Sequence, residues 1–348
     1  MVISVCLGVV IFLTALPPSL SSLWSVDFAL NALESNQSPL TDICRGDNGL
    51  NLNQKDECFR QPDAALAIAE GALDGLVQCS KQLEPRRWNC PYSSKELFKN
   101  GLERNTRETA YVQAITSAGM VYSIARACSR EQIEQCSCDA TDRPAPANNS
   151  FQWGGCGDNL AHGYNYASKF ALYTLSGDAS SLLRNHNSEA GRLAVTENYR
   201  KECYCHGISG SCSLQTCWIV TPTLNTVGEM LTEKYNEASQ VTVSQKDNRP
   251  VLIPGNSQYT APTGKDLVYI EGSPSHCERD EQYGSLGTVG RECDRKPNSI
   301  MNCDVMCCNR GFRRKIVTFT EDCNCKFIWC CHLKCEKCTH VEERYYCK

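Results

Sequence analysis

The chain has 348 residues, 41% of them hydrophobic, which is enough for one large domain or two ordinary ones with packed cores. Its formal net charge is −4 and it has no long basic run, which argues against a nucleic acid as its partner. The most unusual feature of the composition is its large number of cysteines, 25.

The N-terminal stretch has the features of a secretory signal peptide. The first 22 residues carry no charge, and residues 2–16 are almost wholly apolar. Some fifteen apolar residues are short for a membrane span. Ser19 and Ser21 have the small-x-small spacing of a cleavage site. We therefore expect residues 1–21 to be removed and the mature chain to be secreted.

The cysteines of the mature chain indicate a disulfide framework. Removing Cys6 with the signal peptide leaves 24 of the 25 cysteines, an even number. A zinc protein is the alternative, because Cys335-Glu-Lys-Cys338 has zinc-knuckle spacing and Cys323-Asn-Cys325 lies nearby. The signal peptide favours disulfides, so we expect no metal. Two sequons for N-glycosylation agree with secretion: Asn36-Gln-Ser38 and Asn148-Asn-Ser150.

Residues 22–239 are predicted to form a helical N-terminal domain. Apolar side chains recur on one helical face in residues 63–83 and 106–128. These stripes comprise Leu66, Ala69, Leu73, Leu76 and Val77 in the first segment, and Tyr111, Ile115, Ala118, Tyr122 and Ala125 in the second. Further helices are expected over residues 160–175, 179–199 and 223–238. The stripes predict the core of a helix bundle.

The remainder of the chain is predicted to contain little helix. Residues 240–276 lack cysteine and are punctuated by Pro and Gly, so we expect a connector with short strands near Val241, Val243 and residues 267–270. Residues 277–348 hold twelve cysteines and only short apolar runs, which predicts small β-hairpins held by disulfides. The predicted fold class is α+β, a helical N-terminal domain with disulfide-stapled hairpins and a small cysteine-rich β-hairpin C-terminal domain.

The segment 203–217, CYCHGISGSCSLQTC, predicts a stapled hairpin finger. Nested bonds would join Cys205 to Cys212 and Cys203 to Cys217. Loop closure gives roughly 2–3 kcal/mol for the inner bond and about 3 kcal/mol for the outer one, and the two terms do not simply add. Glycines in the tip permit a tight turn that leaves the Ser209 hydroxyl standing clear.

Three interpretations of Ser209 compete. The serines of the tip could simply form hydrogen bonds that stabilise the turn. Ser209 could be a hydrolase nucleophile beside His206, but Ser211 replaces the final glycine of a nucleophile elbow and a disulfide finger is not a strand-to-helix turn. The sequence identifies no acidic partner for three further histidines, His162, His186 and His276. In the third interpretation Ser209 is the acceptor of a covalent modification. A structural matrix protein would need repeats, and none is visible.

A family resemblance decides among these interpretations. The segment CHGISGSC at 205–212, followed by Thr216-Cys-Trp218, resembles the central motif of the Wnt family of secreted morphogens. Supporting motifs are Arg87-Trp-Asn-Cys90, Trp153-Gly-Gly-Cys156, EAGRLAV at 189–195 and CNCKFIWCC at 323–331. The resemblance covers essentially the whole mature chain. It implies a signalling ligand of the extracellular space and matrix, not an enzyme.

The resemblance also implies a modification and partners. The family carries a monounsaturated, palmitoleoyl-type acyl ester on the serine that matches Ser209, attached by the acyltransferase Porcupine. With the neighbouring Ile208, the acyl chain enters a groove of the Frizzled cysteine-rich domain. Wntless is the carrier, and a low-density-lipoprotein-receptor-related co-receptor is expected at the connector. Tyr204 departs from the family, which usually has a basic residue there, and this puts a polar receptor contact at that position in doubt.

A second receptor contact is implied near the C-terminus. Its residues form an apolar cluster: Phe327, Ile328, Trp329, Cys330, Cys331 and Leu333. From the residues alone, Phe327 and Trp329 could equally be a small local core. The resemblance makes them a receptor-facing tip, and Trp is a frequent interface anchor.

The resemblance further implies a full set of disulfides. Besides the two nested bonds these are Cys44–Cys58, Cys79–Cys90, Cys128–Cys136, Cys138–Cys156, Cys277–Cys308, Cys293–Cys303, Cys307–Cys347, Cys323–Cys338, Cys325–Cys335 and the adjacent pair Cys330–Cys331. Geometry alone argues against the adjacent bond, because neighbouring Cα atoms lie about 3.8 Å apart, below the usual disulfide range.

Overall fold

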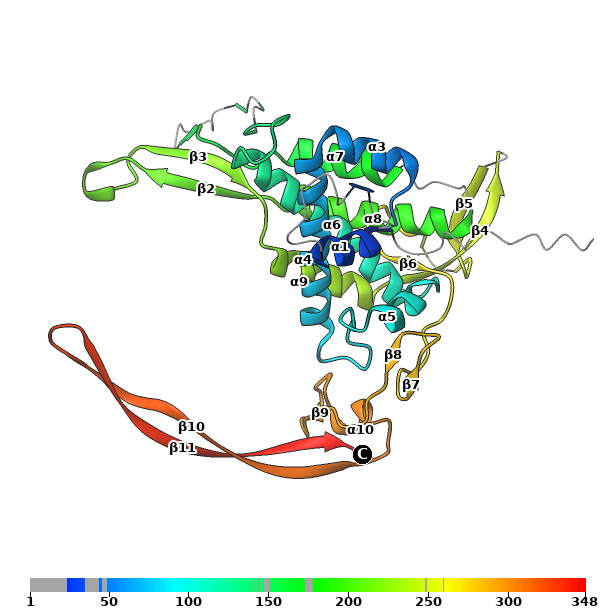
Figure 1. Cartoon of the computed structure of the whole chain (residues 1–348), viewed down its shortest axis with the longest axis vertical. Coiled ribbons are helices and arrows are strands. Elements are labelled where there is room, and N and C mark those ends of the chain that lie inside the picture. The colour runs from blue at the N-terminus through cyan, green and yellow to red at the C-terminus, as the bar shows by residue number, and fades with distance from the viewer. Residues whose placement is uncertain are drawn as a thin grey trace, which may run out of the picture.

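The computed structural model describes residues 24–34, 44–45, 49–139, 141, 143–144, 146, 151–172, 178–247, 249–258 and 260–348. The predicted signal peptide and both sequon asparagines, Asn36 and Asn148, lie outside the described residues. Figure 1 shows a helical body from which two hairpins, β2–β3 and β10–β11, extend on one side, while the hairpin β4–β5 lies on the other side. No helix in the described part of the chain is long and apolar enough to cross a membrane.

The helical body is built around one central helix. The helices are α1 (Trp24–Glu34), α3 (Leu52–Arg60), α4 (Pro62–Leu83), α5 (Lys95–Leu102), α6 (Arg107–Ser129), α7 (Leu160–Leu172), α8 (Ala179–Thr196) and α9 (Leu224–Asn236). Helix α6 is buried along almost its whole length and packs against α4, α7, α8 and α9. At the α4–α6 crossing a Cβ atom on Gly119 would lie 1.9 Å from the Gly71 carbonyl oxygen, so glycine is required for this close approach.

The helices predicted from periodicity exist, but their buried faces differ in detail. Val77 was predicted to be in the core and is 46% exposed, because α4 buries a face that runs through Ile68, Ala72 and Leu76. Helix α8 ends at Thr196, three residues before the expected end. The stretch 173–175 of another predicted helix lies outside the described residues. Helix α9 begins as expected, because the Thr223 side chain caps it by accepting the Thr226 amide at 3.2 Å.

The strands form small sheets. The first has the order β1-β3-β2, with β1 (Gln152–Trp153), β2 (Arg200–Cys205) and β3 (Gln215–Val220). The second has the order β5-β4-β6, with β4 (Ser239–Lys246), β5 (Arg249–Pro254) and β6 (Val268–Tyr269). In the C-terminal region β7 (Arg279–Asp280) pairs with β8 (Ser285–Leu286), and the order β10-β11-β9 joins β10 (Phe312–Ile328), β11 (His332–Cys347) and β9 (Glu292–Cys293). The α+β fold class predicted from the sequence is confirmed.

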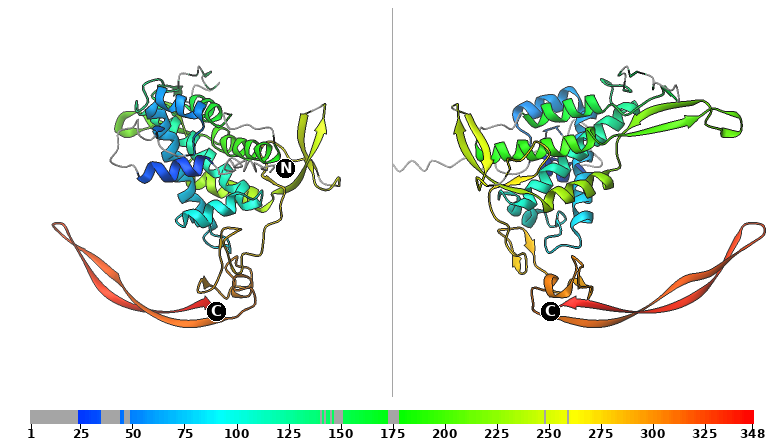
Figure 2. Two further views of the ribbon diagram at one scale, coloured as in Figure 1. Left: turned by 45° about the vertical axis from the view of Figure 1, so that its right-hand side comes forward. Right: turned by 180° about the vertical axis from the view of Figure 1, so that it is seen from behind.

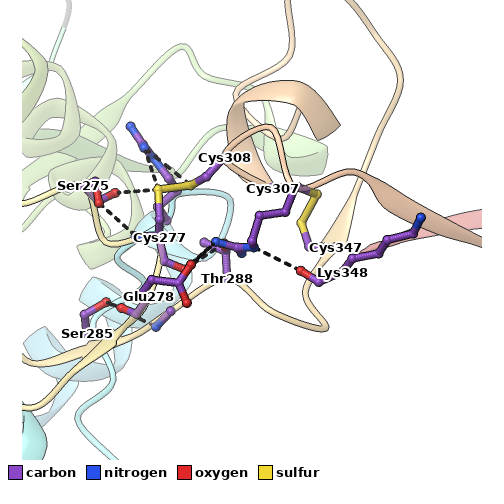
Figure 3. Close-up of polar contacts among 12 residues, drawn as sticks. Ser275, Cys277, Glu278, Ser285, Thr288, Cys307, Cys308, Cys347 and Lys348 are labelled. Carbon is purple, nitrogen blue, oxygen red and sulfur yellow. Dashed lines mark hydrogen bonds and ion pairs between the residues drawn. A yellow bond between two sulfur atoms is a disulfide. The ribbon is translucent and has the colours of Figure 1, made fainter.

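The C-terminal region, which contains α10 (Cys303–Met306), is joined to the helical body through Arg291 and braced internally through Arg310. The Arg291 guanidinium donates to the carbonyl oxygens of Arg86 and Arg87 at 2.6 and 2.7 Å. The Arg310 guanidinium donates to the Cys277 carbonyl at 3.1 Å and to the Glu278 carboxylate at 2.6 Å. Figure 3 shows this joint with the disulfides Cys277–Cys308 and Cys307–Cys347. The base of the C-terminal hairpin is therefore fixed by both covalent and polar bonds.

Among the described residues there are eleven disulfides, and they match the two nested pairs expected from the spacing and the nine further non-adjacent pairs that the family resemblance implies. The expected bond between Cys330 and Cys331 is absent, and both thiols are free and exposed. This expectation was wrong for the structure described here. The physical reason is that a bond between adjacent cysteines must close a small ring through their own peptide bond, and this ring strains the backbone of the turn.

Candidate functional site: two hairpin tips

The N-terminal finger consists of β2, β3 and the tip between them. Cys203 lies directly opposite Cys217 in the antiparallel register, and their disulfide spans a Cα separation of 4.0 Å. The second bond, Cys205–Cys212, closes the tip at a Cα separation of 4.6 Å. Two staples therefore restrict both the shaft and the tip of this finger. Together they limit the movement of any group that the tip presents.

The tip turns through a short 3₁₀ segment, Ile208–Gly210. Its backbone is bonded internally, with the Gly207 amide donating to Ser211 O at 2.8 Å and the Gly210 amide donating to Gly207 O at 2.9 Å. Ser209 has φ 56° and ψ 27°, a left-handed conformation that is uncommon for a residue other than glycine. The turn thus fixes the backbone at Ser209 within an exposed tip.

The side chains of the tip face solvent. Ser209 is exposed, and no described residue forms a hydrogen bond with its hydroxyl. Ile208 beside it is 92% exposed. Ser211 and Ser213 instead bond to each other, with 3.3 Å between their Oγ atoms. The interpretation that the serines serve the turn therefore fits Ser211 and Ser213 better than Ser209.

The surroundings of Ser209 offer little for a hydrolase. His206 Nε2 lies 2.8 Å from Thr216 Oγ1 and is thereby engaged in the shaft of the finger. Sequence reasoning missed an acidic partner for His276, whose Nε2 lies 3.7 Å from Glu108 Oε1. That pair is 7% exposed at both side chains, so it is closed to a substrate. Only the packing of the connector against α6 could reveal this pair.

The Glu108 carboxylate lies in a dense polar cluster. It accepts hydrogen bonds from Ser273 Oγ at 2.5 Å and from Tyr235 Oη at 2.8 Å. Burial alone raises the pKa of Glu108, but contact with His276 and the hydrogen bond from Ser273 outweigh burial and lower this pKa to about 2. The cluster joins α6, α9 and the connector, and it acts as a structural tie.

The shaft of the N-terminal finger carries an aromatic side chain at Tyr204, the position where this sequence differs from the family pattern. Tyr204 is exposed, and its ring meets the His206 ring edge-on at a centroid distance of 5.0 Å. Tyr204 pairs with Thr216 across the strands, and Leu214 is exposed nearby. The position that is usually basic in the family therefore presents an exposed aromatic ring in this chain.

The base of this finger is fixed to the helical body through Asp158. One carboxylate oxygen accepts from Ser129 Oγ at 2.7 Å, at the end of α6. The other accepts from the Thr221 amide at 2.8 Å and from its hydroxyl at 2.9 Å, just after β3. The parallel pairing of β1 with β3 adds a third strand there. Sequence periodicity could not indicate these contacts between distant segments.

The C-terminal finger is a long two-stranded hairpin, β10–β11, stapled by Cys323–Cys338 and Cys325–Cys335. Its turn places Cys330 and Cys331 at φ 71° and 80°. The six residues of the expected receptor contact gather at this tip, with Phe327 opposite Leu333 and Ile328 opposite His332. Phe327 is 70% exposed and Trp329 is 91% exposed, so they do not form a local core.

The cysteines that suggested zinc are engaged elsewhere. Those of the knuckle-like pairs form the two staples of the C-terminal finger. Two further clusters with ligand-like spacing are Cys128, Cys136 and His162, and Cys293, Cys307 and Cys347. All of their cysteines are disulfide-bonded and cannot supply thiolates. Neither cluster fits a metal ion in this oxidised state.

The fold and the site define a disulfide-rich α+β protein that presents exposed apolar side chains at the tips of two stapled fingers. The model of the Wnt family matches residues 47–348. Protein Wnt-5a of Ambystoma mexicanum is 38% identical over 341 residues, which cover 94% of each chain. The chain therefore belongs to the Wnt family of signalling proteins.

Two solved structures were also found to be similar. A chain in the structure of human WLS in complex with WNT8A aligns with a TM-score of 0.57 and 30% identity, covering 93% of this chain and 100% of that one. The N-terminal domain-linker of Drosophila WntD aligns with a TM-score of 0.45 and 21% identity, covering 61% of this chain and 97% of that one.

Proposed function

We propose that this protein is a secreted, lipid-modified morphogen that binds and activates Frizzled receptors. The observation that carries the proposal is the state of Ser209. Its hydroxyl is exposed and free of polar partners in the described structure, within a doubly stapled tip. Porcupine esterifies this hydroxyl with a palmitoleoyl-type acyl chain, and the rigid tip then presents the chain to the receptor.

The acyl chain raises receptor affinity and lowers the solubility of the free protein. Each buried methylene contributes about 0.8 kcal/mol, so a long chain adds on the order of 10 kcal/mol at most when a receptor groove covers it. The same chain would be exposed to water in the free protein, so a carrier is required. The similarity to a chain in the complex of human WLS with WNT8A supports Wntless as that carrier.

The C-terminal tip makes the second receptor contact. In Figures 1 and 2 both fingers extend from the same side of the helical body, so one receptor domain can meet both tips. The exposed Phe327, Trp329 and Leu333 supply apolar area at this contact. Two separate contacts also explain why each finger carries its own staples, since rigid elements lose less conformational entropy on binding.

The connector supplies a surface for a low-density-lipoprotein-receptor-related co-receptor. Its hairpin β4–β5 extends on the side away from the two fingers (Figure 1) and exposes Val243 and Ile253. A receptor on the fingers would therefore leave this hairpin accessible. Exchange of the β4–β5 hairpin should weaken co-receptor binding and spare Frizzled binding. Unchanged co-receptor binding would remove the connector from this role.

The decisive experiment for the acyl site compares Ser209→Ala with Ser213→Ala. Ser213 is an exposed serine of the same finger and serves as the matched control. Ser209→Ala should lose acylation and receptor activation while the helical body keeps its thermal stability. Ser213→Ala should retain acylation and activity. Ester hydrolysis that depends on Ser209 would support an enzyme instead, and full activity of Ser209→Ala would refute the proposal.

A further inference from the structure

One disulfide lies against an arginine that has no acidic partner. Arg87, in the loop after α4, places Nη1 3.4 Å from Cys277 Sγ and 3.8 Å from Cys308 Sγ. None of the ion pairs among the described residues includes Arg87. Both sulfurs of this disulfide accept a hydrogen bond from the same cationic side chain. The guanidinium charge therefore lies directly against this bond.

The bond closes the joint between the connector and the C-terminal region. Cys277 directly follows the buried His276, and Cys308 lies just after α10 (Figure 3). The disulfide spans 31 residues of sequence, and both of its cysteines are partly exposed. The neighbouring bond Cys307–Cys347 is buried. A reductant in solution can thus reach the first bond more readily than the second.

A cation beside a disulfide makes thiol exchange faster. Exchange expels one sulfur as a thiolate, and a sulfur that forms a more stable thiolate leaves faster. Lysine, arginine and protonated histidine stabilise neighbouring thiolates and lower the pKa of the thiol. Because Cys277 Sγ lies nearer to Arg87 than Cys308 Sγ does, Cys277 is the better leaving group.

We infer that Cys277–Cys308 is a reducible bond at the joint, opened by an extracellular dithiol. One thiolate of the dithiol attacks Cys308 Sγ, the protein disulfide breaks, and its electron pair leaves on Cys277 Sγ beside Arg87. The second thiolate of the dithiol then attacks its own sulfur in the mixed disulfide and expels Cys308. The dithiol is oxidised to a disulfide, and the protein gains two cysteines that take up protons from water.

Opening the bond would loosen the base of the C-terminal finger. The Arg310 contacts to Cys277 and Glu278 would remain, so the joint would become mobile without separating. The relative position of the two tips would then vary. On the proposed function, in which both tips contact one receptor, reduction of this bond lowers receptor affinity without changing either tip.

Two measurements on the full secreted protein test the inference. Limited dithiothreitol treatment, followed by alkylation of free thiols and peptide mass spectrometry, gives the opening rate of each disulfide. Arg87→Met should slow the opening of Cys277–Cys308 at least about threefold, and Arg87→Lys should restore most of the rate. The other ten bonds serve as internal controls and should keep their rates.

The second measurement needs no variant, which protects the test if Arg87→Met is poorly secreted. Glutathione, a monothiol, should form its mixed disulfide on Cys308 and leave Cys277 as the free thiol. Glutathione attached mainly to Cys277 would overturn the inference. An unchanged rate of opening in Arg87→Met would overturn it as well.

Discussion

Replacement of Trp329 by alanine separates receptor binding from folding. Trp329 is 91% exposed, so its truncation removes little of the apolar area that is buried on folding. We expect the free energy of unfolding to change by no more than about 0.5 kcal/mol, as is usual for exposed positions. If Trp329 is a receptor anchor, truncation costs about 2 kcal/mol or more of binding free energy, which weakens affinity at least roughly tenfold.

The assay pairs secretion yield and thermal melting with binding to the isolated Frizzled cysteine-rich domain. Val341→Ala is the matched control, because Val341 lies on the same hairpin, is 66% exposed and is distant in sequence from the tip. Trp329→Ala should be secreted normally but bind the receptor domain weakly. Val341→Ala should keep both normal secretion and normal affinity. Normal affinity of Trp329→Ala would remove the C-terminal tip from the receptor site, and failed secretion would show that Trp329 supports the fold.

Two further predictions concern stability. The surroundings of Glu108 lower its pKa from 4.5 to about 2 in the folded protein. The ionised carboxylate therefore stabilises the fold by roughly 3 kcal/mol above pH 4.5, and this contribution is lost as the pH falls toward 2. Acid titration of the melting temperature should show this loss, and Glu108→Gln should make the curve flatter between these pH values. Gly119→Ala places a Cβ atom 1.9 Å from Gly71 O and should destabilise the fold by about 1–3 kcal/mol. Gly264→Ala is the control, because a Cβ atom on Gly264 meets nothing within 4 Å, and this variant should have the melting temperature of the parent protein. Equal melting temperatures of the two alanine variants would show that the α4–α6 crossing is not close.

Local patterns in the sequence were sufficient for much of the fold. The 3.6-residue repeat located α4 and α6 because each buries a continuous face of a helix. The spacing of Cys203, Cys205, Cys212 and Cys217 allowed the nested staples to be derived directly, because a hairpin brings such cysteines opposite each other. The tip at Ser209 followed from the glycines and serines between them.

Contacts between distant segments could not be obtained in this way. The pair Glu108–His276 and the contact of Arg87 with Cys277 depend on how the connector and the C-terminal region pack against the helical body. The error at Val77 has a related cause, since the exact neighbours of a helix decide which flank of its apolar face is covered. The length of β10–β11 was missed because its residues alternate weakly and are exposed on both faces.

The mass of one peptide tests the central claim most directly. Trypsin releases residues 202–234 as a single peptide, because no lysine or arginine occurs between Lys201 and Lys234. In secreted, receptor-active protein this peptide should be heavier by one palmitoleoyl-type acyl group. The added mass should map to Ser209 and disappear on mild alkaline hydrolysis of the ester. An unmodified peptide in active material would contradict the account.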